Sequence, residues 1–265
     1  MKKFLFNTLK VICVIYILIC GLLYFFQEKM IFFPEQLDKK FKFSFAEKYE
    51  ELNLKTQDGT VINSVLFKAD SSKGVIFYLH GNGGSARTWG KVAKTYTSLG
   101  YDIVITDYRG YGKSEGAISG QEQIYSDLQT VYDELKKRYR EDKIVVLGYS
   151  IGTGPAAWVA SINHPRKLIL QGPYYSLTDM MQHTYPIVPT FLLEYKFSTC
   201  QYVAQCKMPV VLFHGNRDEV IYYNSSVKLR EKLKPGDTLI TLNGQGHNGI
   251  TDNGQYLSVL PGVLR

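Results

Sequence analysis

Six apolar runs recur along the chain after residue 70, and they limit most strongly what this sequence can fold into. Each run is continuously apolar instead of alternating, which is typical of strands buried on both faces of a sheet. Helix-like stretches separate the runs. This order predicts an α/β fold with a mostly parallel central sheet and helices on both faces. The runs are GVIFYL, YDIVIT, KIVVLG, RKLILQG, PVVLFHG and DTLITL.

An opening hairpin is predicted ahead of these runs. The segments YEELNLKT and VINSVLFK flank QDGT, in which Asp58 and Gly59 tolerate a tight turn. With 265 residues, 45% of them apolar, the chain is long enough to bury a full core. We therefore expect residues 34–265 to form one folded domain.

The charge balance narrows the classes of partner. The chain has 31 Lys and Arg residues against 24 Asp and Glu, a net charge of +7, which favours contact with anionic membrane surfaces but equally fits a solvated basic surface. No known nucleic-acid-binding motif accompanies the basic clusters, so nucleic acid is not predicted as a partner. No pair of histidines has metal-ligand spacing, and we predict neither a metal nor another cofactor.

The N-terminal segment has a membrane-like composition. Residues 11–26, VICVIYILICGLLYFF, carry no charge and would span about 24 Å as a helix. Counted from Phe4 the helix would reach about 34 Å, enough for a hydrocarbon core of roughly 30 Å if the Lys10 side chain extends to the interface. Residues 1–33 are therefore predicted to be a transmembrane anchor followed by an interfacial segment.

Two questions about this anchor stay open in the sequence. A cleaved signal peptide is the alternative, because Lys2 and Lys3 form a positive start, although no A-x-A-like site follows the apolar run. The flanking lysines do not fix the orientation. A large domain after a signal-anchor can be exported regardless of its charges, so we expect it outside the cytosol, in a periplasm or lumen. There Cys200 and Cys206 could pair, or they could be two buried thiols.

The segment GYSIG carries the first candidate for chemistry. Ser150 follows the run KIVVL directly and precedes GTGPAAWVASI, whose small residues suit a helix packed on a sheet. A serine at such a strand-to-helix turn is the nucleophile of a G-x-S-x-G elbow, where Gly148 and Gly152 avoid collisions between closely packed elements. The pattern alone is common, but this setting favours a reactive Ser150 over a simple turn.

A serine nucleophile needs a base and an acid that orients the base. Asp218 lies just beyond PVVLFHG, and His247 lies among glycines in NGQGHNG, after DTLITL. Both positions fall at the carboxyl edge of the predicted sheet, where open α/β folds bind ligands. Glu219 is the competing acid, and Asp218 is preferred because it is nearer the strand end. His80 and His214 each end a strand in an HG pair and are expected to brace turns.

The site also needs donors for the oxyanion that forms during acyl transfer. The elbow supplies the backbone N–H of Ile151, and the loop HGNGG supplies a second donor, for which the N–H of Asn82 is the first choice and that of Gly83 the next.

Taken together, these motifs resemble the α/β-hydrolase superfamily, and within it the membrane-anchored serine hydrolases of the α/β-hydrolase-domain type. The resemblance runs from the anchor and IFFPEQ through HGNGG, DYRGYGKSEG and GYSIG to HGNRDEVI and GHNGI, essentially the whole chain. It implies the α/β-hydrolase fold, with Ser150 as nucleophile, Asp218 as acid and His247 as base. The oxyanion donors would be Asn82 and Ile151.

The same resemblance suggests how the remaining motifs are used. In DYRGYGKSEG it implies that Asp107 and Arg109 shape a loop beside the site. The family's selectivity depends on a lid between later strands, and here residues 173–197 form a short one, rich in apolar and aromatic residues that could accept an acyl chain or simply cap the core.

The predicted function is hydrolysis of carboxylic esters or thioesters of acyl groups through an acyl-enzyme on Ser150. The expected partners are that substrate and the membrane, with no obligate protein partner inferred. A serine peptidase of the same fold is one alternative, although no site for a substrate's amino terminus can be located. A non-catalytic binding module is the other, although such modules usually lack a triad member.

Overall fold

All six apolar runs and both arms of the hairpin form strands. The computed structural model describes residues 1–265, and its single sheet has eight strands in the order β1-β2-β4-β3-β5-β6-β7-β8. The strands are β1 (Tyr49–Lys55), β2 (Val61–Phe67), β3 (Val75–Leu79), β4 (Asp102–Thr106), β5 (Ile144–Tyr149), β6 (Lys167–Gln171), β7 (Val210–Gly215) and β8 (Thr238–Leu242).

The sheet is mostly parallel, as the sequence predicts. The hairpin strands β1 and β2 pair antiparallel, and β2 joins β4 antiparallel; every later pairing, from β4–β3 to β7–β8, is parallel. Because parallel strands end at the same edge of a sheet, the loops after β3, β5, β7 and β8 lie along its carboxyl-terminal edge. These loops carry the predicted site residues.

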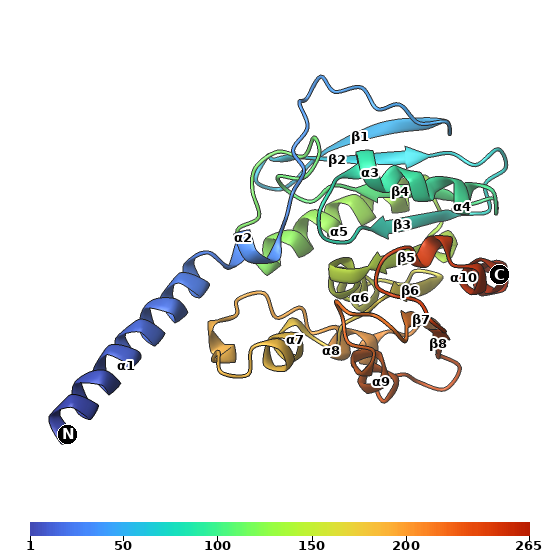
Figure 1. Ribbon diagram of the computed structural model, residues 1–265. Coiled ribbons are helices and arrows are strands. Elements are labelled where there is room, and N and C mark those ends of the chain that lie inside the picture. The colour runs from blue at the N-terminus through green and yellow to red at the C-terminus, as the bar shows by residue number, and fades with distance from the viewer.

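Helices cover both faces of the sheet (Figure 1). Successive residues of β3 enter different cores: Phe77 packs in one and Tyr78 in the other. The continuous apolar runs are thus explained by burial on both faces. One face carries α5 (Gln121–Arg138), α6 (Thr153–Ile162), α8 (Thr199–Gln205) and α9 (Asn224–Arg230), and the other carries α3 (Ala86–Trp89), α4 (Ala93–Thr97) and α10 (Gly254–Leu264).

The N-terminal helix α1 (Lys2–Phe25) projects from the body of the molecule (Figure 1). None of its residues is buried, and by length and composition it is the one helix able to cross a membrane. The short helix α2 (Gln27–Ile31) follows at once, and Phe32 then enters the core against Tyr195. The chain is therefore tied to the domain immediately after α1.

The predicted lid lies between β6 and β7. It contains helix α7 (Leu177–Thr184) and a single turn of 3₁₀ helix at Thr190–Leu192 before the chain reaches α8. Cys200 and Cys206, at either end of α8, are free thiols. Of the two expectations for these cysteines, the unpaired one is therefore the one found. No disulfide supports an oxidising compartment.

Candidate active site

Ser150 occupies a strained turn between β5 and α6. Its φ is +53°, a region that side chains other than glycine rarely adopt. The two glycines of GYSIG are sterically required. A Cβ on Gly148 would lie 2.7 Å from the Cβ of Ala156, and a Cβ on Gly152 would lie 2.2 Å from the carbonyl oxygen of Leu79. The close approach of α6 to β5 and to the end of β3 therefore holds Ser150 in the strained geometry of the elbow.

Three predicted residues meet in one hydrogen-bonded chain. The Ser150 Oγ lies 2.9 Å from His247 Nε2, and His247 Nδ1 lies 2.7 Å from Asp218 Oδ2. Ser150 is 8% exposed, His247 is 6% exposed, and the Asp218 side chain is fully buried. Glu219, the competing acid, is exposed and makes none of these contacts. The geometry therefore favours Asp218 as the carboxylate that orients His247.

Asp218 is held by the backbone as well as by two imidazoles. Its Oδ1 accepts hydrogen bonds from the N–H groups of Val220 (2.9 Å) and Ile221 (2.8 Å). Its Oδ2 contacts His214 Nε2 (3.1 Å) in addition to His247. Burial alone would raise the pKa of the Asp218 carboxyl, but the hydrogen bonds from His214 and His247 outweigh it and hold that pKa well below its usual range.

His214 does more than brace a turn, which was its expected role. Its Nε2 lies 2.9 Å from the carbonyl oxygen of Ile221 and therefore carries the proton, because that oxygen only accepts. The other ring nitrogen, Nδ1, accepts from the Ser226 hydroxyl at 2.6 Å. The residue thus donates to the same carboxylate oxygen as His247. His214 stands four residues before Asp218, at the end of β7, and this position is the sequence signal that could have identified its role.

Hydroxyl groups fix the backbone around the elbow and the base, and the sequence did not single them out. The Tyr149 hydroxyl donates to the carbonyl oxygen of His247 at 2.6 Å, and the Tyr174 hydroxyl donates to that of Ile151 at 2.9 Å. The Thr153 hydroxyl donates to the Ser150 carbonyl oxygen at 2.6 Å. Tyrosine and threonine are common core residues, so nothing in their local sequence distinguishes these positions.

The loop HGNGG follows β3, and its Asn82 is tied to the segment after α2. The Asn82 side-chain oxygen accepts from the N–H of Phe33 (3.0 Å), the N–H of Gly83 (2.9 Å) and the hydroxyl of Tyr111 (3.1 Å). Its amide nitrogen donates to the carbonyl oxygen of Ile31. The backbone N–H of Asn82 makes no hydrogen bond within the protein. That group is therefore free to bind a ligand, as an oxyanion donor must be.

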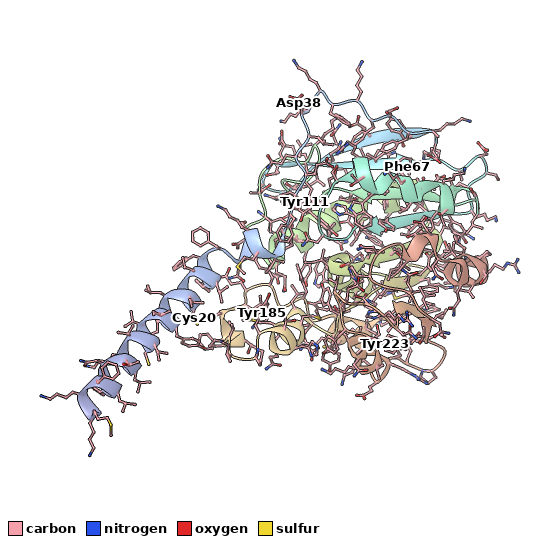
Figure 2. The ribbon with its side chains drawn as sticks, viewed as in Figure 1. Cys20, Asp38, Phe67, Tyr111, Tyr185 and Tyr223 are labelled. Atoms are coloured by element: carbon pink, nitrogen blue, oxygen red, sulfur yellow. The ribbon has the colours of Figure 1, made fainter.

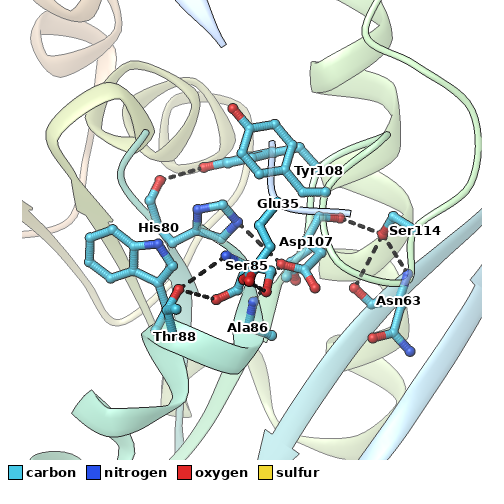
Figure 3. Close-up of polar contacts among 12 residues, drawn as sticks. Glu35, Asn63, His80, Ser85, Ala86, Thr88, Asp107, Tyr108 and Ser114 are labelled. Carbon is cyan, nitrogen blue, oxygen red and sulfur yellow. Dashed lines mark hydrogen bonds and ion pairs between the residues drawn. The ribbon is translucent and has the colours of Figure 1, made fainter. Parts of the chain in front are cut away.

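A buried polar cluster packs next to the same loop (Figure 3). His80 Nδ1 donates to the carbonyl oxygen of Gly81 at 2.8 Å, and its Nε2 lies 3.5 Å from Asp107 Oδ1. The hydrogen bond to that carboxylate oxygen comes from the N–H of Ala86, at 2.7 Å. The Tyr108 hydroxyl donates to the His80 carbonyl oxygen at 3.1 Å. His80 thus has the bracing position expected of it, and Asp107 shapes the loop.

Arg109 is also placed as a structural residue. Its guanidinium makes a two-pronged contact with Asp127 of α5, Nε to Oδ2 at 2.6 Å and Nη2 to Oδ1 at 2.8 Å. Its Nη1 reaches Asp58 of the hairpin turn at 2.7 Å. Arg109 therefore links the hairpin to a helix on the sheet and has no contact with Ser150 or His247.

Comparison with known proteins gives the same picture at the level of the whole chain. A family model described as "Serine aminopeptidase, S33" matches residues 70–200. Alpha/beta hydrolase domain-containing protein 17B of Xenopus laevis is 30% identical over 196 residues, and the Homo sapiens protein of that name is 29% identical. Each alignment covers 72% of this chain and 66% of the relative, so the chain matches just under two thirds of the relatives' length.

Solved structures match over more of the chain. An esterase of Pyrococcus furiosus aligns with a TM-score of 0.68 at 20% identity, covering 88% of this chain and 96% of that one. The thioesterase domain from the curacin biosynthetic pathway aligns with a TM-score of 0.62 at 14% identity, covering 82% and 99%. At these identities the likeness shows the fold alone. Sequence relatives, fold and elbow geometry agree, and the chain belongs to the α/β-hydrolase superfamily.

Proposed function

We propose that this protein is a serine hydrolase that cleaves carboxylic esters or thioesters of acyl groups. The observation that carries the proposal is the continuous chain of contacts from Ser150 Oγ through His247 to Asp218 at a strained elbow. A serine that only shapes a turn would not need a buried base within hydrogen-bond distance of its hydroxyl and a buried acid behind that base. Two of the solved neighbours are described as an esterase and a thioesterase domain, which is consistent with this substrate class.

The geometry supports acyl transfer in two halves. Ser150 Oγ attacks the substrate carbonyl carbon while His247 Nε2 takes its proton, and Asp218 keeps the imidazole in the tautomer with the proton on Nδ1. The N–H groups of Asn82 and Ile151 would stabilise the oxyanion. Collapse releases the alcohol or thiol, which receives the proton from His247. Water then attacks the acyl-enzyme while His247 takes one of its protons. The bond from the acyl carbon to Ser150 Oγ breaks, His247 returns the proton to that oxygen, and the carboxylic acid leaves.

A serine peptidase on the same residues is the second candidate, favoured by the description of the family model that matches residues 70–200. A binding module without chemistry is the third, and the intact Ser150–His247–Asp218 chain counts against it. Hydrolysis rates on matched ester, thioester and amide substrates separate the three. An amide rate as high as the ester rate favours the peptidase, and no turnover of any of them favours the module.

We further propose that residues 1–33 anchor the protein in a membrane and that residues 34–265 form the catalytic domain outside the cytosol. The support for the anchor is the 24-residue apolar helix with no buried residue. Protease accessibility in sealed vesicles and extraction with alkaline carbonate test the two halves of this proposal separately. Release by carbonate argues against the anchor. Digestion of the domain in sealed vesicles whose cytosolic face is outward argues against export.

The decisive experiment on function is labelling by a fluorophosphonate probe in detergent. Wild-type protein and the Ser258→Ala variant, which loses an exposed hydroxyl on α10, should label equally. Ser150→Ala should not label at all, because the phosphonylated oxygen is missing. A folded wild-type protein that fails to label, or a Ser150→Ala variant that labels normally, contradicts the proposal.

A further inference from the structure

The lid lies against the second half of α1, an arrangement that the catalytic residues do not require. The Tyr16 hydroxyl donates to the carbonyl oxygen of Ile187 at 2.7 Å. Just beyond α1, Gln27 is buried between the two segments, where its side chain donates to Leu192 O (3.3 Å) and accepts from the N–H of Glu194 (2.9 Å). Figure 2 shows Tyr185 of the lid on the side of the domain that faces α1.

An apolar cleft of about 520 Å³ lies between these two segments. Its volume is within the range of small-molecule sites, roughly 300–1,000 Å³. Of its 13 lining residues 11 are hydrophobic, and no charged side chain is among them. The anchor side contributes Leu23, Met30 and Ile31, and the lid side contributes Met180, Met181 and Leu192.

Two lining residues of the cleft are bonded to the loops that carry predicted site residues. Ile31 accepts a hydrogen bond from Asn82, the expected oxyanion residue. Val220 lies in the loop of Asp218 and donates its N–H to that carboxylate. The cleft is therefore adjacent to the loops of Asn82 and Asp218, beside the predicted site.

The contact with Tyr16 sets the depth of the lid relative to the anchor. Tyr16 lies nine residues before Phe25, the end of α1. At 1.5 Å per residue this is about 14 Å along the helix, close to half of a hydrocarbon core of roughly 30 Å. A helix that spans the bilayer thus carries the loop around Ile187 below the membrane surface. Ile187 is 78% exposed and Phe191 is 81% exposed, so both side chains would lie in lipid.

The backbone of this loop is suited to an apolar medium. Irregular backbone is costly there because unpaired N–H and C=O groups find no water. Pro186 and Pro189 have no N–H to satisfy. Among their neighbours, the N–H of Val188 donates to Tyr185 O and that of Leu192 to Pro189 O. Ile187 O is paired to the anchor, so these groups do not stay unpaired in the apolar medium.

We propose that residues 185–193 of the lid insert into the bilayer beside α1, and that the cleft between them is a lateral port that admits the acyl chain of a membrane-resident ester or thioester. The proposal rests on the proposed anchor and serine-hydrolase function and specifies how the substrate reaches Ser150. The occupant is a hydrocarbon chain, because the cleft is apolar and one of its walls consists of Leu23 of α1 and the residues of α2 that follow directly, next to the lipid chains that would surround α1.

The insertion of the lid is tested without any catalytic readout. Full-length protein is placed in vesicles whose phospholipid acyl chains carry bromine, which quenches nearby tryptophan. The Phe191→Trp variant should lose a large part of its added fluorescence, measured against the parent with Trp89 and Trp158. Leu257→Trp, an exposed apolar position on α10 at the far side of the domain, is the matched control and should not be quenched. Equal quenching at the two positions overturns the insertion.

The use of the port is tested by chain length. In the double variant Ile187→Asp/Phe191→Asp, two charges oppose insertion, and hydrolysis of a long-chain ester embedded in vesicles should fall by about tenfold or more. Hydrolysis of a water-soluble butyrate ester and labelling by fluorophosphonate should stay within about twofold, because neither side chain lines the cleft. A loss that is equal for both substrates, or no loss for either, overturns the port.

These readouts separate failure of the port from failure of the proposed function. If wild-type protein neither labels nor hydrolyses butyrate, the proposed chemistry is wrong, whereas the quenching result still reports lid insertion. If labelling and butyrate hydrolysis are normal but Phe191→Trp is not quenched, the chemistry stands and the port is wrong.

Discussion

The two regions on either side of Ser150 are stabilised in opposite ways. In the acid and base loops both carboxylate oxygens of Asp218 accept hydrogen bonds, and the carboxylate is fully buried. In the lid, Phe191 is 81% exposed and few contacts hold the loop apart from those to α1 and Gln27. The first region is determined by its own hydrogen bonds. The lid instead presents exposed apolar side chains, which in the proposal above are covered by lipid.

The strongest test of the first region is Asp218→Asn. The amide keeps the shape but favours the wrong tautomer of His247, so turnover should fall about 10⁴-fold. Ester hydrolysis at saturating substrate measures the loss, with Glu219→Gln, the exposed neighbouring acid, as the control that should keep full activity. Equal losses in both variants would mean that Asp218 and Glu219 both orient His247, which the contacts of Asp218 alone do not predict.

The next effect is on stability and concerns Arg109. Arg109→Met leaves the buried Asp127 carboxylate without its partner and should lower the free energy of unfolding by about 3–5 kcal/mol. Arg87→Met removes an ion pair between Glu35 and a half-exposed arginine, which solvent screens, and should cost much less than Arg109→Met. Urea unfolding in detergent measures both. A small cost at Arg109 would contradict the view that this buried ion pair stabilises the contact between the hairpin and α5.

A smaller effect should appear in the pH dependence of stability. The pKa of the Asp218 carboxyl is lower in the folded than in the unfolded protein. Its charge therefore stabilises the fold above an unfolded pKa of about 3.9, by roughly 1–3 kcal/mol, and this stability is lost as pH falls toward the folded pKa. Asp218→Asn should thus unfold at lower urea than wild type at pH 7, and the gap should narrow at pH 3. A gap independent of pH would assign the effect to packing.

His214→Asn tests whether the second imidazole positions the acid. Without the hydrogen bond to Asp218 Oδ2, the carboxylate is held less firmly against His247. We expect kcat to fall by about tenfold with KM unchanged, because the acid orients the base for the chemical step and not for substrate binding. A lower thermal midpoint with an unchanged kcat would leave His214 with a structural role only.

The smallest effect should come from reduction. Cys200 and Cys206 are free, so dithiothreitol should change the thermal midpoint by no more than about 1 °C. Burial raises the pKa of the Cys206 thiol to about 12, so iodoacetamide should modify Cys206 only after unfolding, while half-buried Cys200 reacts sooner. Mass spectrometry of the alkylated peptides measures both. A large drop in the midpoint would reveal a pairing of the two cysteines.

Much of the candidate site could be predicted because it depends on local sequence. The positions of the strands follow from apolar runs, and Ser150, Asp218 and His247 each lie in the connection after such a run, so a parallel sheet brings them to one edge. His214 was assigned too small a role because its link to Asp218 depends on how the loop folds back across four residues. The hydroxyls of Tyr149 and Tyr174 act at sequence separations that no local pattern reveals.

The sequence by itself determined the sheet, the elbow and the apolar character of α1, because burial on both faces, steric demand at Gly148 and Gly152, and hydrophobic length are properties of short segments. Only the tertiary structure decided that the lid lies along α1 and that Asn82 is bonded to the segment beyond it. Those contacts join residues far apart in the chain, and apolar side chains in a lid look the same in sequence whether they face a core, water or lipid.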